Sequence, residues 1–312
     1  MGEAKRRHDA AQQGTKVGAH HVVIIEWLPA DERQTGTDLA NVIRPWHKCG
    51  VTHRPCHCAA EVLAALYDTL EDLKTTGQVP IVHIEAHGIA PADDENDGIA
   101  GPDGNGGTEY LYWKQLAPLL GEINLHARFR VLLVGAACHG INALDSIEIT
   151  SRHAPFTALI GFDGKVKVRG LFESMSALYW QLLNGGHGNL PQAVEVANRE
   201  LSNSVGEELK LTTCRSFFLA AVVGYLGTEL EPAYRAKENE RLRLLMLGQG
   251  KSLSASDVDR MFRQAMRQRL REIVKIYFAY DALPENRQRF PVNVGRIIHE
   301  QEQLYAQIKR DT

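Results

Sequence analysis

The chain is poor in the features that direct a sequence toward secretion, membranes or repeat architectures. It has five cysteines, an odd number at uneven spacings, which argues against a framework of disulfides. Its apolar runs all fall short of the ~18 residues that a membrane span needs. The N-terminal segment is charged and polar, without the apolar stretch of a secretory signal. We therefore expect a cytoplasmic protein that does not act at a membrane.

The net charge of −3 conceals an uneven distribution along the chain. From Arg235 onward there are 16 basic and 10 acidic residues, whereas the preceding part has 19 basic and 28 acidic ones. This asymmetry has two interpretations: the two parts dock on each other, or the basic part binds an acidic partner. A hydrophobic content of 44% in 312 residues is enough for one large core with an appendage.

Two strand-like apolar runs each end in a chemically reactive side chain. Val79–Gly88 reads VPIVHIEAHG and ends at His87, and Phe129–Gly140 reads FRVLLVGAACHG and ends around Cys138, 51 residues after the histidine. A thiol is a strong nucleophile only as a thiolate, so it needs a base nearby. Neighbouring parallel strands bring their carboxyl ends to one edge of the sheet, where α/β proteins commonly place their sites. The pattern therefore predicts a Cys–His hydrolase.

Together, the two motifs resemble those of the caspase-like cysteine peptidases (clan CD), which include caspases, metacaspases and bacterial CHAT-type proteases. The caspase signature Gln-Ala-Cys-x-Gly, with its histidine roughly 50 residues upstream, is matched by residues 136–140, AACHG, except at the first position. The resemblance covers residues 18–230. It implies a cysteine endopeptidase that cleaves proteins or peptides and needs no cofactor. As in the bacterial members, it further implies a regulated effector that acts in defence.

The resemblance also assigns roles to individual residues. His87 would be the acid/base and Cys138 the nucleophile that forms an acyl-enzyme, while the backbone N–H groups of Gly88 and Cys138 would form the oxyanion hole. Metacaspases carry an acid two residues before the cysteine that holds a basic P1 side chain, and caspases carry glutamine there. This chain has Ala136 at that position, so any charge in the substrate pocket must come from other residues.

Several acids are candidates for the charge of that pocket. Glu85 lies two residues before His87 and would either orient the histidine or line the pocket. The loop after the first strand contributes residues 31–33, DER, and Asp163 follows another predicted strand. Asp163 would favour a basic P1 residue, although a turn aspartate in the sequence FDGK explains it equally well.

The reactive residues also have interpretations without this chemistry. Cysteine is among the most buried residue types, and a masked Cys138 would make the fold a catalytically silent interaction module. His83, Glu85 and His87 alternate along one strand and share a face, a spacing at which histidines can bind zinc. A metal-dependent hydrolase is therefore a second alternative. The competing interpretation of His83 is that it is an ordinary interior histidine.

A second group of cysteines and histidines is His47, Cys49, His53, Cys56, His57 and Cys58. Its spacing is irregular for a zinc site, and no second pair follows at the distance typical of zinc ribbons. We expect a loop with incidental thiols. Zinc binding and a regulatory disulfide or oxidation site are the alternatives.

The order of predicted elements favours an α/β fold with a mostly parallel sheet covered on both faces by helices. After a tail at 1–17, strands are predicted at His20–Leu28, Val79–Gly88, Phe129–Gly135 and Phe156–Phe162, and helices at Ala59–Leu73, Trp113–Leu125, Gly170–Leu183 and Pro191–Leu201. A long loop is predicted between the first strand and the first helix. The turn-rich segment Ala90–Gly107 is expected to form a hairpin or an excursion over the site. The apolar run Phe217–Leu226 ends the peptidase domain, predicted to span 18–230.

Residues 231–312 are predicted to form a C-terminal helical domain, with helices at Arg235–Leu247, Ser254–Ala282 and Val294–Lys309. It either packs on the core or binds a regulatory protein. Opposite the apolar face of the middle helix lie five arginines, at 260, 263, 267, 269 and 271. A solvated or acid-paired helix face is the commoner explanation of such a row, so nucleic acid is not favoured as a partner. Gly248–Ser252 reads GQGKS but lacks the first glycine of a phosphate loop, so no nucleotide cofactor is expected.

Overall fold

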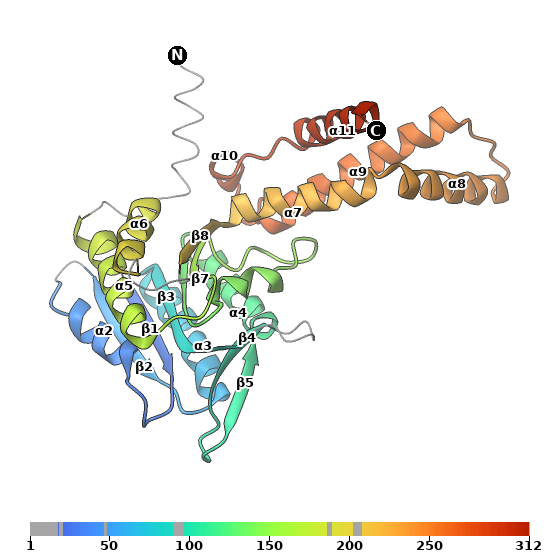
Figure 1. Ribbon diagram of the computed structural model, residues 1–312. Helices are drawn as coiled ribbons and strands as arrows, with labels where there is room; N and C mark the ends of the chain where they lie inside the picture. The colour runs from blue at the N-terminus through green and yellow to red at the C-terminus, as the bar shows by residue number, and fades with distance from the viewer. Residues whose placement is uncertain are drawn as a thin grey trace. The chain divides into compact units, whose positions relative to one another are not determined.

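The computed structural model describes residue 18 and residues 21–46, 49–89, 97–185, 189–201 and 208–311, apart from the side chains at 232, 305 and 308–311 (Figure 1). The chain divides into two compact units, residues 1–148 with 152–215 and residues 149–151 with 216–312. The division falls earlier than the predicted domain boundary at residue 230. The reason is that Phe218 packs its ring against Tyr277 and Phe278, at centroid distances of 5.0 and 5.1 Å, within the second unit.

The first unit is built on a mostly parallel sheet with the strand order β2-β1-β3-β6-β7-β8. Its strands are β1 (His21–Trp27), β2 (Gly50–Pro55), β3 (Pro80–Ile89), β6 (Leu132–Ala136), β7 (Ala158–Phe162) and β8 (Leu209–Thr213). All neighbours along this path are parallel except β8, which runs antiparallel to β7. The hairpin of β4 (Gly98–Pro102) and β5 (Thr108–Tyr112) extends the end of β3. The predicted α/β fold with a mostly parallel sheet is confirmed.

Helices cover both faces of this sheet (Figure 1). On one face lie α3 (Ala59–Thr76) and α4 (Trp113–His126), packed against side chains such as Val82 and Leu133. On the other face lie α2 (Thr35–Ile43), α5 (Val168–Trp180) with the π-helical turn η2 (Gln181–Gly185), and α6 (Leu190–Leu201). Ile24, Ile81 and Val134 face these helices. Strands buried on both faces read as continuous apolar runs, which is why β1, β3 and β6 were predictable.

Three parts of the first unit and its border differ from the predictions. The predicted loop between the first strand and α3 contains helix α2 and strand β2. These elements have only nine and six residues, so each shows too few apolar positions for a clear periodicity. Strand β8 was not predicted because its five residues, LKLTT, lie at an edge. The apolar run Phe217–Leu226 forms part of helix α7 (Cys214–Glu229). The predicted hairpin after β3 is present as β4–β5, while its first residues, 90–96, lie outside the described part.

The second unit is helical, as predicted for the C-terminal region. It consists of α7, α8 (Pro232–Gly248), α9 (Ala255–Tyr277), α10 (Asn286–Arg289) and α11 (Val294–Asp311). Its core contains stacked aromatic rings, since Phe278 lies 5.3 Å from Phe290 at an interplanar angle of 12°. Within the described residues, every helix is too short or too polar to cross a membrane.

Candidate active site

The register of β3 and β6 brings His87 and Cys138 to the same point of the sheet edge. In this parallel pair His83 is opposite Val134 and Glu85 is opposite Ala136, a constant offset of 51 residues. Continuing the same offset places His87 beside Cys138. The 51 residues that separate the two motifs in the sequence therefore equal the offset at which β3 pairs with β6. Neighbouring strands lie about 4.8 Å apart, so the ends of the two motifs lie close together.

Gly88 shows how closely the two strand ends approach. A Cβ atom at this position would lie 1.7 Å from the carbonyl oxygen of Cys138 and 2.9 Å from its Cα. Any side chain there would displace the backbone, so only glycine allows the strand after His87 to contact the turn that carries the thiol. The glycine of the first motif is therefore explained by packing against the second motif.

The turn that carries Cys138 is held by further close contacts. His139 adopts a left-handed conformation with φ of 56°, and its N–H donates to the carbonyl of Gly164. A Cβ at Gly140 would lie 2.3 Å from the carbonyl oxygen of Gly135 in β6. The 3₁₀ helix η1 (Gly140–Ser146) begins at this contact and packs against β6 and β7. The backbone on both sides of the cysteine is thus tied to the sheet.

The two reactive side chains have defined polar partners. The Cys138 thiol is half-buried, and its Sγ accepts a hydrogen bond of 3.4 Å from the N–H of Val166. The His87 side chain is 50% exposed, and its Nε2 lies 3.1 Å from the Glu32 carboxylate. In the described chain the hydrogen-bond partner of His87 is therefore Glu32 and not the thiol. Its imidazole is accessible from solvent.

A narrow cavity of about 70 Å³ brings most of the predicted site residues together. It is lined by Leu28, Glu32, Arg33, Thr35, Glu85, Ala86, His87, Ala136, Ala137, Cys138, Val166, Val168 and Leu171. Asp163 is not among them, and its carboxylate instead lies 3.5 Å from Lys210 Nζ of the neighbouring strand β8. The site therefore joins both catalytic candidates to Glu85 and Ala136, while Asp163 lies apart from it.

Glu85 belongs to a buried chain of hydrogen bonds behind the cavity. One of its carboxyl oxygens accepts from the Thr35 hydroxyl, and the other lies 3.2 Å from His83 Nε2. His83 Nδ1 in turn lies 3.1 Å from the hydroxyl of Tyr179, which is fully buried. Burial raises the pKa of Glu85, and the hydrogen bond from His83 opposes this effect only in part. The carboxyl group is thus held in an environment that stabilises charge poorly.

Glu26 is the neighbour of Glu85 on β1 and has the opposite electrostatic setting. It accepts hydrogen bonds from the N–H of Gly36 at 2.6 Å, the N–H of Thr37 at 3.1 Å and His53 Nε2 at 2.8 Å. Burial tends to raise the pKa of Glu26, but these bonds outweigh it, so the pKa lies below its ordinary value. Glu26 therefore anchors the N-terminal end of α2, where an anion is favoured.

Sequence reasoning missed the roles of Glu32 and Thr35. Glu32 was considered as a pocket charge, but its contact with His87 is a tertiary one across 55 positions. Thr35 lies in a segment predicted as loop. The spacing of Leu39, Ala40 and Ile43, which are buried on one side of α2, was the available signal for a helix that begins at Thr35.

The second group of cysteines and histidines does not converge on a common point. His53 is bonded to Glu26, while Cys56 is buried and Cys49 and Cys58 are half-buried. Burial raises the pKa of Cys49 to about 11 and that of Cys56 to about 12. His47 lies outside the described residues. Within the described ranges, no three His, Cys, Asp or Glu side chains are arranged to hold a metal ion, at this segment or at His83, Glu85 and His87.

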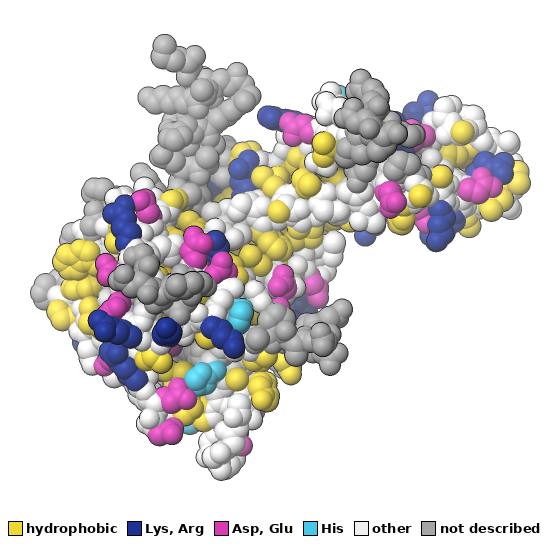
Figure 2. All heavy atoms as spheres, in the orientation of Figure 1, with side chains coloured by type: hydrophobic (Ala, Val, Ile, Leu, Met, Phe, Trp, Pro, Cys, Tyr) yellow, Lys and Arg dark blue, Asp and Glu magenta, His cyan; other side chains and the backbone are white. Residues whose placement is uncertain are grey.

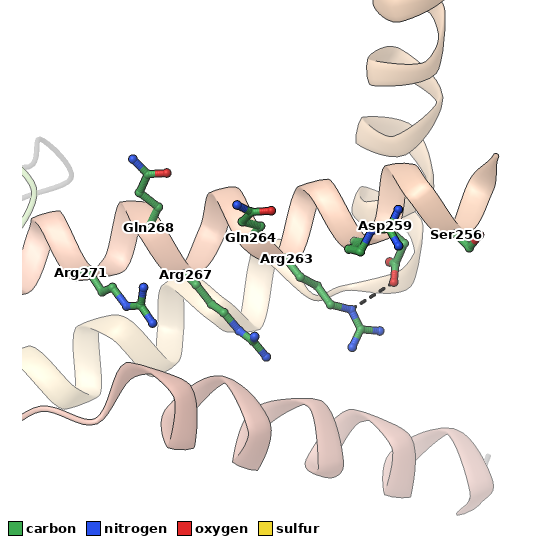
Figure 3. Close-up of a pocket in the computed structure, with 8 residues that line it drawn as sticks. Ser256, Asp259, Arg263, Gln264, Arg267, Gln268 and Arg271 are labelled. Carbon is green, nitrogen blue, oxygen red and sulfur yellow. Dashed lines mark hydrogen bonds and ion pairs between the residues drawn. The ribbon is translucent and has the colours of Figure 1, made fainter. Parts of the chain in front are cut away.

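Four of the five arginines in the predicted row, at 260, 263, 267 and 271, line a surface hollow of about 610 Å³ along α9, while Arg269 lies over the ring of Tyr225 (Figure 3). Arg263, Arg267 and Arg271 leave the helix on the same side. Arg263 bonds to Asp259 at 3.0 Å and to Glu302 of α11 at 3.2 Å. Acidic side chains are interspersed with basic ones on the face of the molecule shown in Figure 2. Part of the basic charge is therefore neutralised within the helical unit.

The comparisons with known proteins do not place the chain in a family. No family model matches it, and no curated protein matches it. The feature of the chain that indicates a function is the sheet edge at which His87 and Cys138 line one cavity.

Proposed function

We propose that this protein is a cysteine endopeptidase in which Cys138 attacks a peptide carbonyl of a protein substrate, with His87 as acid and base. The observation that carries the proposal is the contact of Gly88 with the Cys138 backbone, which brings both reactive side chains to one cavity at the sheet edge. This is the pairing that the resemblance to caspase-like peptidases predicts for the two motifs.

Glu32 gives the histidine a defined orientation and tautomer. When His87 Nε2 carries the ring proton, it donates to the Glu32 carboxylate at 3.1 Å. Nδ1 is then the basic nitrogen and accepts the proton of the thiol. Glu32 acts through His87 and is a positioning residue.

The reaction then follows the chemistry of an acyl-enzyme. The Cys138 thiolate forms a bond to the carbonyl carbon, and the backbone N–H groups of Gly88 and Cys138 stabilise the oxyanion. Protonated His87 gives its proton to the leaving amine as the peptide bond breaks. His87 next removes a proton from water, which attacks the thioester and releases the acid product with regeneration of the thiol.

The helical unit and the cellular setting complete the proposal. The helices after residue 216 would recruit a regulatory protein that controls the protease, in the manner of bacterial caspase-like effectors that act in defence. All described cysteines are free thiols, which suits the reducing cytoplasm. The regulatory partner and the role in defence are implied by the resemblance, and the free thiols support the cytoplasmic setting.

The proposal is tested by cleavage of a fluorogenic peptide library that varies the P1 residue. We expect Cys138→Ala and His87→Ala to lower the rate by about a thousandfold or more, whereas Cys58→Ala, at another half-buried thiol, serves as the matched control. A wild-type protein that cleaves nothing, and whose Cys138 resists alkylation until unfolded, would contradict the proposal and favour a silent interaction module. Activity that survives in Cys138→Ala but disappears with a chelator would favour a metal-dependent hydrolase.

A further inference from the structure

The hollow along α9 contains two arginines that lack an acidic partner in the described part of the chain. Arg263 is bonded at 3.0 Å to Asp259 and at 3.2 Å to Glu302. Arg267 and Arg271 are exposed, and neither pairs with a carboxylate among the described residues. Both leave α9 on the same side (Figure 3). A guanidinium group presents a planar fork of donors that fits a carboxylate, so this end of the hollow offers two places for acidic groups.

The spacing of these two arginines determines the spacing of the acids that they would bind. Arg267 and Arg271 are four residues apart on α9, which corresponds to a rise of about 6 Å along the helix axis. In an extended peptide, alternate side chains lie on one face about 7 Å apart. Acidic residues at positions i and i+2 of an extended segment therefore match the two guanidinium groups.

Arg271 also borders a second hollow, of about 580 Å³, in the same helical unit. Lys275 and Arg287 contribute further positive charge to its lining. Its apolar surface comes from side chains of α9 and of the start of α11, namely Val274, Pro291, Val292 and Val294. An apolar residue that follows the acids in the same segment would contact this surface. The two hollows together therefore suit a segment in which acidic and apolar residues share one face.

The lining of the two hollows favours a peptide over a nucleic acid. A polynucleotide needs a continuous row of cations for its phosphates and aromatic rings on which its bases stack. In the described lining, the acidic side chains of Asp259 and Glu272 interrupt the basic row. The one aromatic ring there, that of Tyr280, already contacts Phe278 and Arg287. Carboxylates separated by neutral residues fit this interrupted pattern better than a chain of phosphates does.

We propose that Arg267 and Arg271 bind an acidic segment of a partner protein, and that an apolar residue of this segment occupies the second hollow. The excess of basic over acidic residues from Arg235 onward, 16 against 10, then serves an acidic partner. This inference rests on the proposed function, in which the helical unit recruits a regulatory protein. It names the chemistry by which that protein is recognised.

The test measures the fluorescence polarisation of the labelled peptide LSESESESL with the full chain carrying Cys138→Ala, so that cleavage does not change the probe. The glutamates and leucines of this peptide lie on one face when it is extended, in either chain direction. We expect it to bind about fivefold more tightly than LSQSQSQSL at low ionic strength, because two exposed ion pairs are gained. The difference should shrink as salt is added, since the arginines are exposed. Replacing both leucines by serine should weaken binding about threefold.

Two variants assign the binding to the arginines. With Arg267→Gln and Arg271→Gln combined, the preference for the glutamate peptide should fall to near one. Arg243→Gln, at an arginine of α8 that pairs with Glu240 at 2.8 Å, is the matched control and should keep the preference. A preference that persists in the double variant, or that is lost in Arg243→Gln, would overturn the assignment. If the double variant does not fold, as judged by circular dichroism, a benzoylphenylalanine in place of one leucine decides: its cross-links should fall at 291–295, and cross-links elsewhere would overturn the proposal.

Failure of this inference is distinguishable from failure of the proposed function. Equal binding of the glutamate and glutamine peptides, or binding of neither, would overturn the docking surface and leave the cleavage test of Cys138 unaffected. Tighter binding of a single-stranded oligothymidylate than of the glutamate peptide would overturn it in favour of a nucleic-acid surface. If the wild-type protein cleaves nothing and the glutamate peptide still binds through the two arginines, the docking surface stands and the peptidase alone is refuted.

Discussion

Cysteine and histidine concentrate in two regions of this chain, the ends of β3 and β6 and the segment 49–58. The fold arranges these two regions in opposite ways. His87 and Cys138 are far apart in sequence but become neighbours because β3 pairs with β6 at a constant offset. Residues 49–58 are adjacent in sequence, but in the described part of the chain their thiols and imidazoles do not gather into a group that could hold a metal, with His53 bonded to Glu26 and Cys56 buried. The difference teaches that strand register, rather than closeness in sequence, assembles reactive groups into a site.

The difference between the two segments is largest in the reactivity of their thiols. At pH 7.5, iodoacetamide should alkylate Cys138 before Cys49 and Cys56. Because burial raises the pKa of Cys49 to about 11 and that of Cys56 to about 12, less than about one in a thousand of these groups is a thiolate at that pH. Peptide mapping by mass spectrometry over time measures the rates.

A denatured sample is the control for the thiols. In guanidinium all five cysteines should react at similar rates. If Cys49 or Cys56 in the folded protein were modified as fast as Cys138, the contrast between the segments would be lost.

The contact between the two strand ends is tested by Gly88→Ala. The added methyl group would meet the Cys138 carbonyl oxygen at 1.7 Å, so the backbone of one motif must move. We expect peptidase activity to fall by about a hundredfold, since a displacement near 1 Å has that effect in active sites. Steady-state kinetics with the preferred peptide provides the measurement.

Gly224→Ala is the matched variant for this prediction. Nothing lies within 4 Å of a Cβ at Gly224, and the residue is inside helix α7. Alanine there should leave activity unchanged and raise stability by about 0.5–1 kcal/mol. Full activity in Gly88→Ala would show that the strand ends are not held together as described.

The structural role of His53 and Glu26 is tested by Glu26→Gln. The variant should lower the free energy of unfolding by about 2 kcal/mol at pH 7, because buried N–H donors of α2 lose a charged acceptor. The pKa of Glu26 is lowered in the folded protein, so its stabilisation is present above the ordinary value of 4.5 and is lost as the pH falls through the folded value. Urea unfolding between pH 7 and pH 3 should show the gap closing.

An exposed carboxylate provides the comparison for Glu26. Glu195 pairs with Arg199 on the surface of α6, and Glu195→Gln should change stability by less than about 0.5 kcal/mol. A gap for Glu26→Gln that stays constant from pH 7 to pH 3 would contradict the assigned charge state.

Much of the sheet and the reactive pair was predictable because the relevant signals are local. The apolar runs of β1, β3, β6 and β7 are those of strands buried on both faces. The glycines after His87 and Cys138 marked strand ends. By contrast, α2, β2 and β8 were missed because each is short and its burial comes from partners distant in sequence.

The sequence by itself determined the α/β class and the helical C-terminal region, and its motif spacing predicted that His87 and Cys138 lie at one edge of the sheet, since periodicity and motif spacing are properties of the chain. Only the tertiary structure decided that Glu32 bonds to His87, that Thr35 bonds to Glu85, and that Asp163 pairs with Lys210 instead of entering the cavity. The physical reason is that these contacts depend on strand register and helix placement. Packing of the whole sheet sets both, and no single segment encodes them.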